Sequence, residues 1–111
     1  MTYLRLKKKK DFSKILRSGK RAFSSTLTVS YLPSREVRMA VCVGKKYGKS
    51  VQRNRIKRLL REAFRAESGR IAQPCSFLLI PKVAKEYSYA AFRKDIANIL
   101  RREKLIETER V

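Results

Sequence analysis

The segment from Lys45 to Arg65 most constrains the fold, because it combines a regular apolar pattern with a dense positive charge. Its sequence, KKYGKSVQRNRIKRLLREAFR, holds nine Lys or Arg and a single acid, Glu62. From about Ser50 onward, apolar residues recur at the three- and four-residue spacing of a helix face that packs on a core. These residues are Ile56, Leu59, Leu60, Ala63 and Phe64. The segment is therefore predicted to form an amphipathic helix.

The opposite side of this predicted helix is basic. Arg53 with Lys57, and Lys57 with Arg61, are like-charge pairs at four-residue spacing, and each destabilises an isolated helix by roughly 0.2–0.5 kcal/mol. A face that only keeps a protein soluble usually mixes both signs of charge, whereas arginine and asparagine suit phosphates and base edges. We therefore expect a polyanion to neutralise this face. Its polar side chains are Arg53, Asn54, Arg55, Lys57, Arg58, Arg61 and Arg65.

The whole chain shares this bias. Its 111 residues include 29 Lys or Arg and 9 Asp or Glu, a formal net charge of +20, yet 43% are hydrophobic. We therefore expect a single folded nucleic-acid-binding domain over residues 1–111, with a frayed tail from about 104 to 111. No segment approaches the ~18 apolar residues of a membrane span, and the basic start lacks the apolar run of a signal peptide. We expect a cytoplasmic protein without a membrane partner.

Two segments alternate between apolar and polar residues with the period of a β-strand. The apolar side holds Phe23, Leu27, Val29 and Tyr31 in residues 22–32, and Val37, Met39, Val41 and Val43 in residues 37–43. The other side of each strand is small or polar. We therefore expect a sheet that packs helices on one side only and leaves its second face free to bind a partner.

The remaining elements complete an α+β domain. A short amphipathic helix ends at Gly19, Ser50 is the expected N-cap of the basic helix, and that helix is expected to end near Arg65 or Glu67. A buried strand over residues 76–80 ends at Pro81. A final helix over about 90–102 buries Phe92, Ile96, Ile99 and Leu100. We predict a single-domain α/β sandwich of about four strands and three helices, with the basic helix connecting two strands of the sheet.

Catalytic groups are scarce in the sequence. There is no histidine, so neither a Ser/His/Asp nor a Cys/His nucleophilic arrangement is available. The acids are dispersed, whereas a metal-dependent nuclease that acts alone needs convergent carboxylates. Cys42 and Cys75 belong to no CxxC pair, so we expect reduced cysteines, no metal site and no catalytic residue.

Residues 43–65, VGKKYGKSVQRNRIKRLLREAFR, resemble the signature of the protein subunit of bacterial ribonuclease P. That signature is a strand ending in V-x-K-K, an aromatic or aliphatic residue and a glycine, a short spacer, and the helix R-N-x-I-K-R-x-x-R-E. The stretch RLKKKKDFSKILRSGK is similar to the family's N-terminal helix pattern L-K-x-x-x-D-F-x-x-[FIL]. The predicted order of strands and helices over residues 1 to about 105 also agrees with that family.

The resemblance implies a ribonucleoprotein endonuclease in which a large RNA, holding Mg²⁺ ions, removes the 5′ leader from precursor tRNA. The protein would assist as a monomer, one per ribonuclease P RNA, without being catalytic by itself. By matching positions, the RNA-binding residues would be Lys45, Lys46, Lys49, Arg53, Asn54, Arg55, Lys57, Arg58, Arg61 and Arg65. The family's left-handed strand–helix–strand crossover is also implied, although the general rule predicts a right-handed one.

The resemblance also implies a leader-binding cleft between the N-terminal helix and the open face of the sheet. Its residues would be Phe12, Leu16, Ser30, Arg38 and Cys42. Leu16 stands where the family often has an aromatic residue, and Ser30 replaces a frequent tyrosine, with Tyr31 expected on the opposite face. Stacking on an aromatic side chain contributes ~1–3 kcal/mol per base, so we expect weaker stacking at these two positions.

Two residue roles and two other protein classes stay open from the sequence. The spacing of Phe12 with Ile15 and Leu16 is typical of a core residue as well as of a cleft residue, and Asn54 suits a helix-start cap as well as an RNA contact. A structural, ribosomal-type RNA-binding protein would share the charge and size but would stimulate no cleavage. A nuclease acting alone would need a carboxylate cluster.

Overall fold

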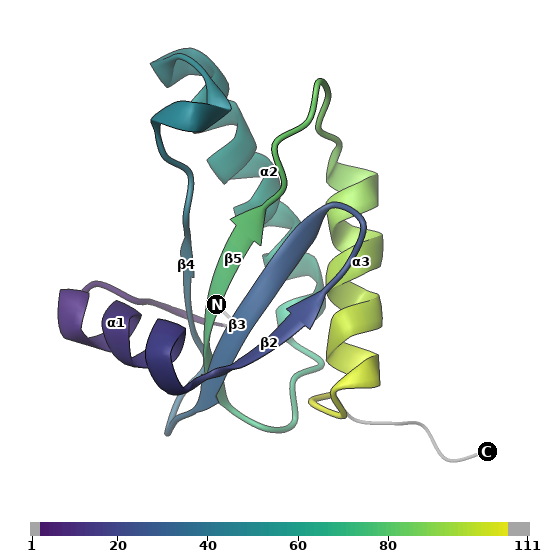
Figure 1. Cartoon of the computed structure of the whole chain (residues 1–111). Helices are drawn as coiled ribbons and strands as arrows, with labels where there is room; N and C mark the ends of the chain where they lie inside the picture. The colour runs from purple at the N-terminus through teal and green to yellow at the C-terminus, as the bar shows by residue number, and fades with distance from the viewer. Residues whose placement is uncertain (1–2, 107–111) are drawn as a thin grey trace.

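The computed structural model describes residues 3–106 and consists of one sheet with helices on both faces (Figure 1). Its elements are β1 (Leu4–Arg5), α1 (Lys9–Ser18), β2 (Lys20–Phe23), β3 (Leu27–Pro33), β4 (Arg38–Val41), the 3₁₀ turn η1 (Lys45–Tyr47), α2 (Ser50–Ser68), β5 (Cys75–Pro81) and α3 (Tyr89–Arg102). The strand order is β1-β4-β5-β3-β2. The α+β prediction is confirmed; the expected number of strands was about four, and the two-residue β1 makes a fifth.

Helix α2 connects two parallel neighbours, β4 and β5. In Figure 1 both strands ascend, β5 lies to the right of β4, and α2 passes behind the sheet. This arrangement is a left-handed crossover, as the resemblance implied and against the general preference for right-handed ones.

The main core lies between one face of the sheet and the two helices that pack on it, α2 and α3. The rings of Phe64 from α2 and Phe77 from β5 lie 5.3 Å apart, centroid to centroid. All four residues predicted for the inner face of the last helix are buried, and so are four of the five predicted for the basic helix. Leu59 is the exception, because it packs at the rim and is only partly buried. The helical periodicity therefore predicted both inner faces.

Helix α1 packs on the opposite face of the sheet, so the expectation of helices on one side only is wrong. Ile15 of α1 is 2% exposed and forms a second apolar cluster with Leu6 and Leu78. Gly19 follows the helix at a position where there is no room for a side chain. A Cβ atom there would lie 2.5 Å from the carbonyl oxygen of Ile15 and 2.8 Å from that of Tyr31. The glycine lets the end of α1 approach β3 closely.

The strand predicted over residues 22–32 is in fact two antiparallel strands, β2 and β3, joined by a tight turn. In the turn, Ser24 donates from its backbone N–H and from its hydroxyl to the carbonyl oxygen of Leu27, at 3.0 and 2.7 Å. The turn changes which residues face the core: Ala22 is 3% exposed, whereas Phe23, predicted to be inside, is 60% exposed.

The start of α2 also differs from the prediction. The N-cap of α2 is Lys49, not Ser50; its backbone N–H donates to Oε1 of Gln52 at 3.2 Å. Gly48 precedes it with φ of 117°, a conformation that favours glycine.

The expected fraying does not begin at residue 104. Leu105 and Ile106 are buried, and Ile106 pairs with Ile71. The rest of the expected tail, residues 107–111, lies outside the described residues. Within residues 3–106, no helix is both long and apolar enough to span a membrane.

Candidate nucleic-acid interface

The outward side of α2 carries cations that have no acidic partner. Along its length, Arg53, Lys57 and Arg61 are partly buried, while Asn54 and the other helix cations are exposed. Among the described residues, none of the six Lys or Arg side chains of α2 forms an ion pair. The side chain of Arg53 donates to the Ser50 hydroxyl, at 3.2 Å. The face is thus free to bind phosphates, which also relieves its own repulsion.

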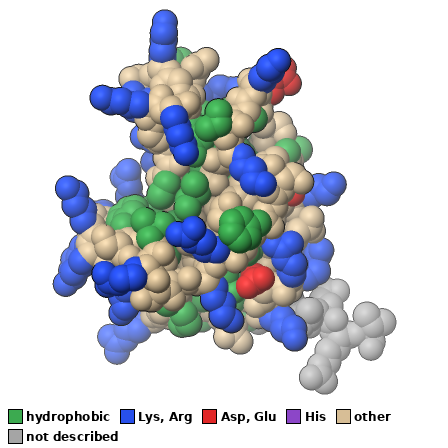
Figure 2. All heavy atoms as spheres, viewed as in Figure 1, with side chains coloured by type: hydrophobic (Ala, Val, Ile, Leu, Met, Phe, Trp, Pro, Cys, Tyr) green, Lys and Arg blue, Asp and Glu red, His purple; other side chains and the backbone are tan. Residues whose placement is uncertain are grey.

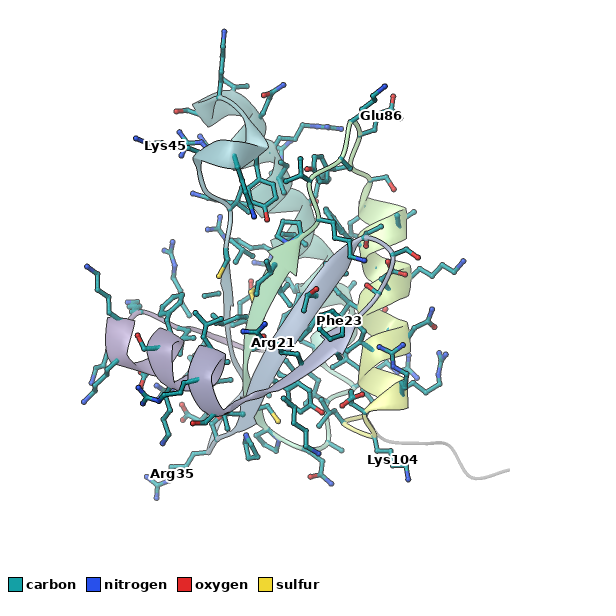
Figure 3. The ribbon with its side chains drawn as sticks, in the orientation of Figure 1. Arg21, Phe23, Arg35, Lys45, Glu86 and Lys104 are labelled. Carbon is teal, nitrogen blue, oxygen red and sulfur yellow. The ribbon has the colours of Figure 1, made fainter. Side chains whose placement is uncertain are left out.

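Three further lysines, Lys45, Lys46 and Lys49, are exposed in the segment that leads into α2. Figure 3 shows Lys45 pointing away from the body of the molecule at this end. The segment is anchored by Tyr47, whose buried hydroxyl donates to the carbonyl oxygen of Pro81 at 2.5 Å. The lysines therefore extend the basic surface of α2 from a fixed base.

A pocket of about 440 Å³ lies between α1, the edge of β4 and α2. Four cations line it, Arg5, Lys57, Arg61 and Arg65, and none of the described residues around it is acidic. Phe12 of α1 lines the same pocket. The pocket therefore joins the basic side of α2 to the aromatic side chain predicted for the cleft. Arg5 was not among the predicted site residues, since its strand lies far from the basic helix in sequence.

Three of the five predicted cleft residues lie on one side of α1. Phe12 and Cys42 are partly buried against the second apolar cluster, and Leu16, one turn after Phe12, is 43% exposed. Burial raises the pKa of the Cys42 thiol, so the group stays neutral at neutral pH. Both Cys42 and Cys75 are free. This side of α1 offers an apolar surface beside the basic pocket.

The structure places the other two predicted cleft residues elsewhere. Ser30 is fully buried, because it pairs with Leu78 under α1, and its hydroxyl has no hydrogen-bond partner within residues 3–106. Arg38 lines a different hollow with Asp11 and Lys14 on the other edge of α1. The position of α1 on the sheet, which the strand pattern does not contain, decides both placements.

The face of the molecule that carries α1 and the uncovered part of the sheet is strongly basic. Figure 2 shows apolar side chains gathered near its centre, surrounded by Lys and Arg side chains, with very few acidic groups. Apolar side chains ringed by cations are typical of surfaces that bind single-stranded nucleic acid, in which bases contact the apolar part and phosphates contact the cations.

Comparisons with known proteins agree with this geometry. A profile of the family described as Ribonuclease P matches residues 2–104. The chain is 38% identical over 94 residues to the ribonuclease P protein component of Thermus brockianus, covering 83% of this chain and 56% of that protein. It is 30% identical over 109 residues to the Bacillus pumilus component, covering 95% of this chain and 92% of that one. The chain thus spans little more than half the length of the Thermus relatives and nearly all of the Bacillus relative.

Solved structures give the same result. The ribonuclease P protein of Thermotoga maritima superposes with a TM-score of 0.78 at 28% identity, covering 94% of this chain and 98% of that one. The protein from Staphylococcus aureus gives 0.75 at 25% identity, covering 93% and 97%. The fold, the basic helix and the match over nearly all of the sequence together show that the chain belongs to the ribonuclease P protein family.

Proposed function

We propose that the chain is the RNA-binding protein subunit of a ribonuclease P and assists a catalytic RNA in removing the 5′ leader from precursor tRNA. The observation that carries this proposal is a set of α2 cations that have no acidic partner among the described residues. A pocket whose described lining holds no acid joins them to the uncovered face of the sheet. Its partners are ribonuclease P RNA and precursor tRNA, with one protein monomer per RNA, and its location is the cytoplasm.

The geometry divides the work between two surfaces. The exposed side of α2 binds the phosphates of the RNA core, which fixes the position of the protein without reading a sequence. Lys57 and Arg61 line both this side and the pocket, so they guide the leader from the RNA core toward Phe12. A single strand then lies beside α1, where apolar and aromatic side chains contact its bases.

Mg²⁺, when bound, supplies the hydrolytic chemistry of such an enzyme. The donors of this chain do not fit it: Mg²⁺ prefers carboxylate oxygens, and the described residues contain no group of three His, Cys, Asp or Glu that could hold a metal ion. The basic pocket itself is lined by cations. We therefore assign the ions to the RNA and to substrate phosphates, and the chain alone performs no catalytic step.

The direct test is cleavage of a precursor tRNA by a bacterial ribonuclease P RNA at low Mg²⁺, with and without the chain. We expect strong stimulation, and its loss when Arg58 and Arg61 are both changed to Ala. The matched control replaces Lys94 and Arg101, two exposed cations of α3, by Ala. Tight, salt-sensitive RNA binding without any stimulation would instead favour a structural RNA-binding protein.

A second variant tests the leader path. Phe12→Ala should weaken binding of substrates that carry a leader and leave a leaderless tRNA unaffected, because Phe12 lines the pocket rather than the main core. Equal losses on both substrates, together with a lower melting temperature, would place Phe12 in the core only.

A further inference from the structure

One row of side chains crosses four strands on the sheet face that carries α1. Phe23 on β2 pairs with Thr28 on β3, and Thr28 pairs with Ile80 on β5. Cys42 continues β4 beside them, since its backbone N–H donates to the carbonyl oxygen of Leu79 at 2.9 Å. Paired residues of neighbouring strands point to the same face, so the row is continuous.

Helix α1 does not cover this row. It packs on the neighbouring row, where Ser30 and Leu78 are fully buried. In the uncovered row Thr28, Ile80 and Cys42 are partly exposed, and exposure is greatest at Phe23, the end on the edge strand. The row therefore forms a strip of accessible surface that runs across the sheet from the end of β4, which leads into α2, to the edge strand β2.

The exposure of Phe23 follows from the register of β2. That register places the small Ala22 in the core and the large Phe23 outside, 60% exposed. A single exposed aromatic side chain is ordinary by itself. Here the same strand also presents Arg21 on the same face, and Figure 3 shows the two side chains next to each other in front of the sheet.

Hydrogen bonds from α3 hold β2 and the turn after it in place, and with them Arg21 and Phe23. Nη2 of Arg102 donates to the carbonyl oxygen of Phe23 at 2.7 Å. The turn that follows is fixed by Asp95, which accepts from the backbone N–H of Thr26 at 2.9 Å and from its hydroxyl at 2.6 Å. A rigid edge strand loses little conformational freedom when a ligand binds to it.

We propose that Phe23 and Arg21 form a subsite for one unpaired nucleotide of single-stranded RNA, with its base stacked on the Phe23 ring and its phosphate bound by the Arg21 guanidinium. Aromatic rings stack on any base, and arginine binds phosphate through paired donors. The subsite supplies the aromatic surface that Leu16 and the buried Ser30 do not. This inference rests on the proposed function, in which the RNA is the leader of a precursor tRNA.

The location of the subsite predicts which nucleotide it binds. The strip from Cys42 to Phe23 spans three strand spacings, roughly 14 Å. At ~3.4 Å per stacked nucleotide, this distance corresponds to about four nucleotides. Since α2 binds the RNA core and lies at the Cys42 end, the leader reaches Phe23 with nucleotides farther from the cleavage site than those beside Phe12.

The test uses the holoenzyme, reconstituted from a bacterial ribonuclease P RNA and the full chain, and precursor tRNAs whose leaders lengthen one nucleotide at a time. Phe23→Ala should match the unmodified chain on short leaders and bind about 5- to 150-fold more weakly once the leader reaches the subsite. Phe12→Ala should show its loss at a shorter leader length. Phe23→Tyr, which keeps a ring, should retain affinity for long leaders.

Two further variants complete the test. Arg21→Gln should lower the slope of log affinity against log salt by about 0.7, the value for one phosphate of a single strand. Val83→Ala, at a loop residue with 61% exposure, is the matched control and should change nothing. Melting temperatures of the Arg21 and Phe23 variants should equal that of the unmodified chain, because both side chains are exposed.

The inference fails if Phe23→Ala equals the unmodified chain at every leader length, or if it weakens leaderless tRNA as much as long-leader substrates. Either result leaves the proposed function intact, provided that the unmodified chain stimulates cleavage. Absence of stimulation by the unmodified chain would instead overturn the proposed function, and with it the assignment of the nucleotide to a leader.

Discussion

Helices α2 and α3 pack side by side on the same face of the sheet, yet they use their outward charges differently. On α3, Nε of Arg93 lies 2.8 Å from Oε2 of Glu67, and Arg102 and Asp95 bond to the β2–β3 hairpin. On α2, the outward cations have no acidic partner among the described residues. Charges that bond within the molecule support the fold, whereas the cations of α2 gather on one side of the helix, where three of them line the basic pocket, and are available to a ligand.

The one buried acid of α2 sharpens this difference. Glu67 is 5% exposed and lies on the inner side of the helix, where it accepts from Arg93 of α3 and, at 3.3 Å, from Arg70. It therefore stabilises the contact between the two helices and leaves the outward cations unneutralised. On α2, the buried acid is paired, whereas the outward cations have no acidic partner among the described residues.

The largest effect should appear in the salt dependence of RNA binding. If α2 and its flanking lysines contact roughly 6–10 phosphates, affinity should fall about 10³- to 10⁵-fold between 50 and 200 mM salt. Arg58→Ala with Arg61→Ala should flatten the slope by about two phosphate contacts, measured by filter binding or fluorescence anisotropy. The α3 pair, Lys94→Ala with Arg101→Ala, should leave the slope unchanged. Equal salt slopes for the two double variants would mean that the cations of α2 contact RNA no more than those of α3 do.

The inner sides of the two helices should behave alike. Leu60 of α2 and Ile99 of α3 are both fully buried. Leu60→Ala and Ile99→Ala should each lower the free energy of unfolding by ~2–5 kcal/mol, because each leaves a cavity in the main core. Urea unfolding followed by circular dichroism measures this. A large loss for one helix only would mean that the two do not share one core.

The sequence pattern predicts which residues of both helices are buried, but it does not predict the arrangement of residues around β2. Three- and four-residue periodicity depends only on local spacing, so it predicted the buried sides of α2 and α3. The alternation over residues 22–32 continues through the turn at Ser24, and the pattern alone cannot distinguish one long strand from two short ones. The alternation therefore predicts Phe23 on the core side, whereas the observed register exposes it.

The candidate site shows the same limit. The unpaired cations of α2 were predicted because they lie on one helix, where neighbours are set by spacing. The cleft depends on how α1 crosses the sheet, a long-range contact that buries Ser30 and separates Arg38 from Phe12. Arg5 joins the basic pocket for the same reason. Residues brought together by tertiary packing were beyond what spacing could predict.

A smaller effect should appear in the stability of the fold at alkaline pH. The hydroxyl of a buried tyrosine forms a hydrogen bond near one end of each helix. The hydroxyl of Tyr31 donates to Glu103 beside the end of α3, and that of Tyr47 donates to Pro81 near the start of α2. Burial raises the pKa of both phenols, and for Tyr31 the hydrogen bond to Glu103 and its charge add to the effect. Above pH ~10 the unfolded chain loses these protons first, so stability should fall as pH rises.

Tyr31→Phe should reduce the number of protons released on unfolding above pH ~10 by about one. The measurement is the pH dependence of the free energy of unfolding from urea titrations. At neutral pH both the folded and the unfolded chain keep the phenol protonated, so the variant should show no pH-dependent difference there. An unchanged alkaline slope would show that the Tyr31 phenol ionises equally readily in both states.

The smallest effect should be a gain in stability from removing charge on α2. Lys57 has a cation four residues away on each side, Arg53 and Arg61, and each like-charge pair costs roughly 0.2–0.5 kcal/mol. Lys57→Gln should therefore stabilise the isolated chain by about 0.4–1 kcal/mol at low salt, measured by urea unfolding. The gain should shrink as added salt screens the repulsion.

The matched substitution on α3 is Lys94→Gln. Its neighbours at four-residue spacing are Ala90 and Asn98, so no repulsion is removed and stability should stay within ~0.5 kcal/mol. The same Lys57→Gln variant should bind RNA less tightly, because Lys57 lines the basic pocket. Higher stability combined with weaker RNA binding, seen on α2 and not on α3, would show that the repulsion on α2 is retained for its ligand. If Lys94→Gln stabilised the chain as much as Lys57→Gln, the gain would come from the net charge of +20 on the whole chain and not from the like-charge pairs of α2.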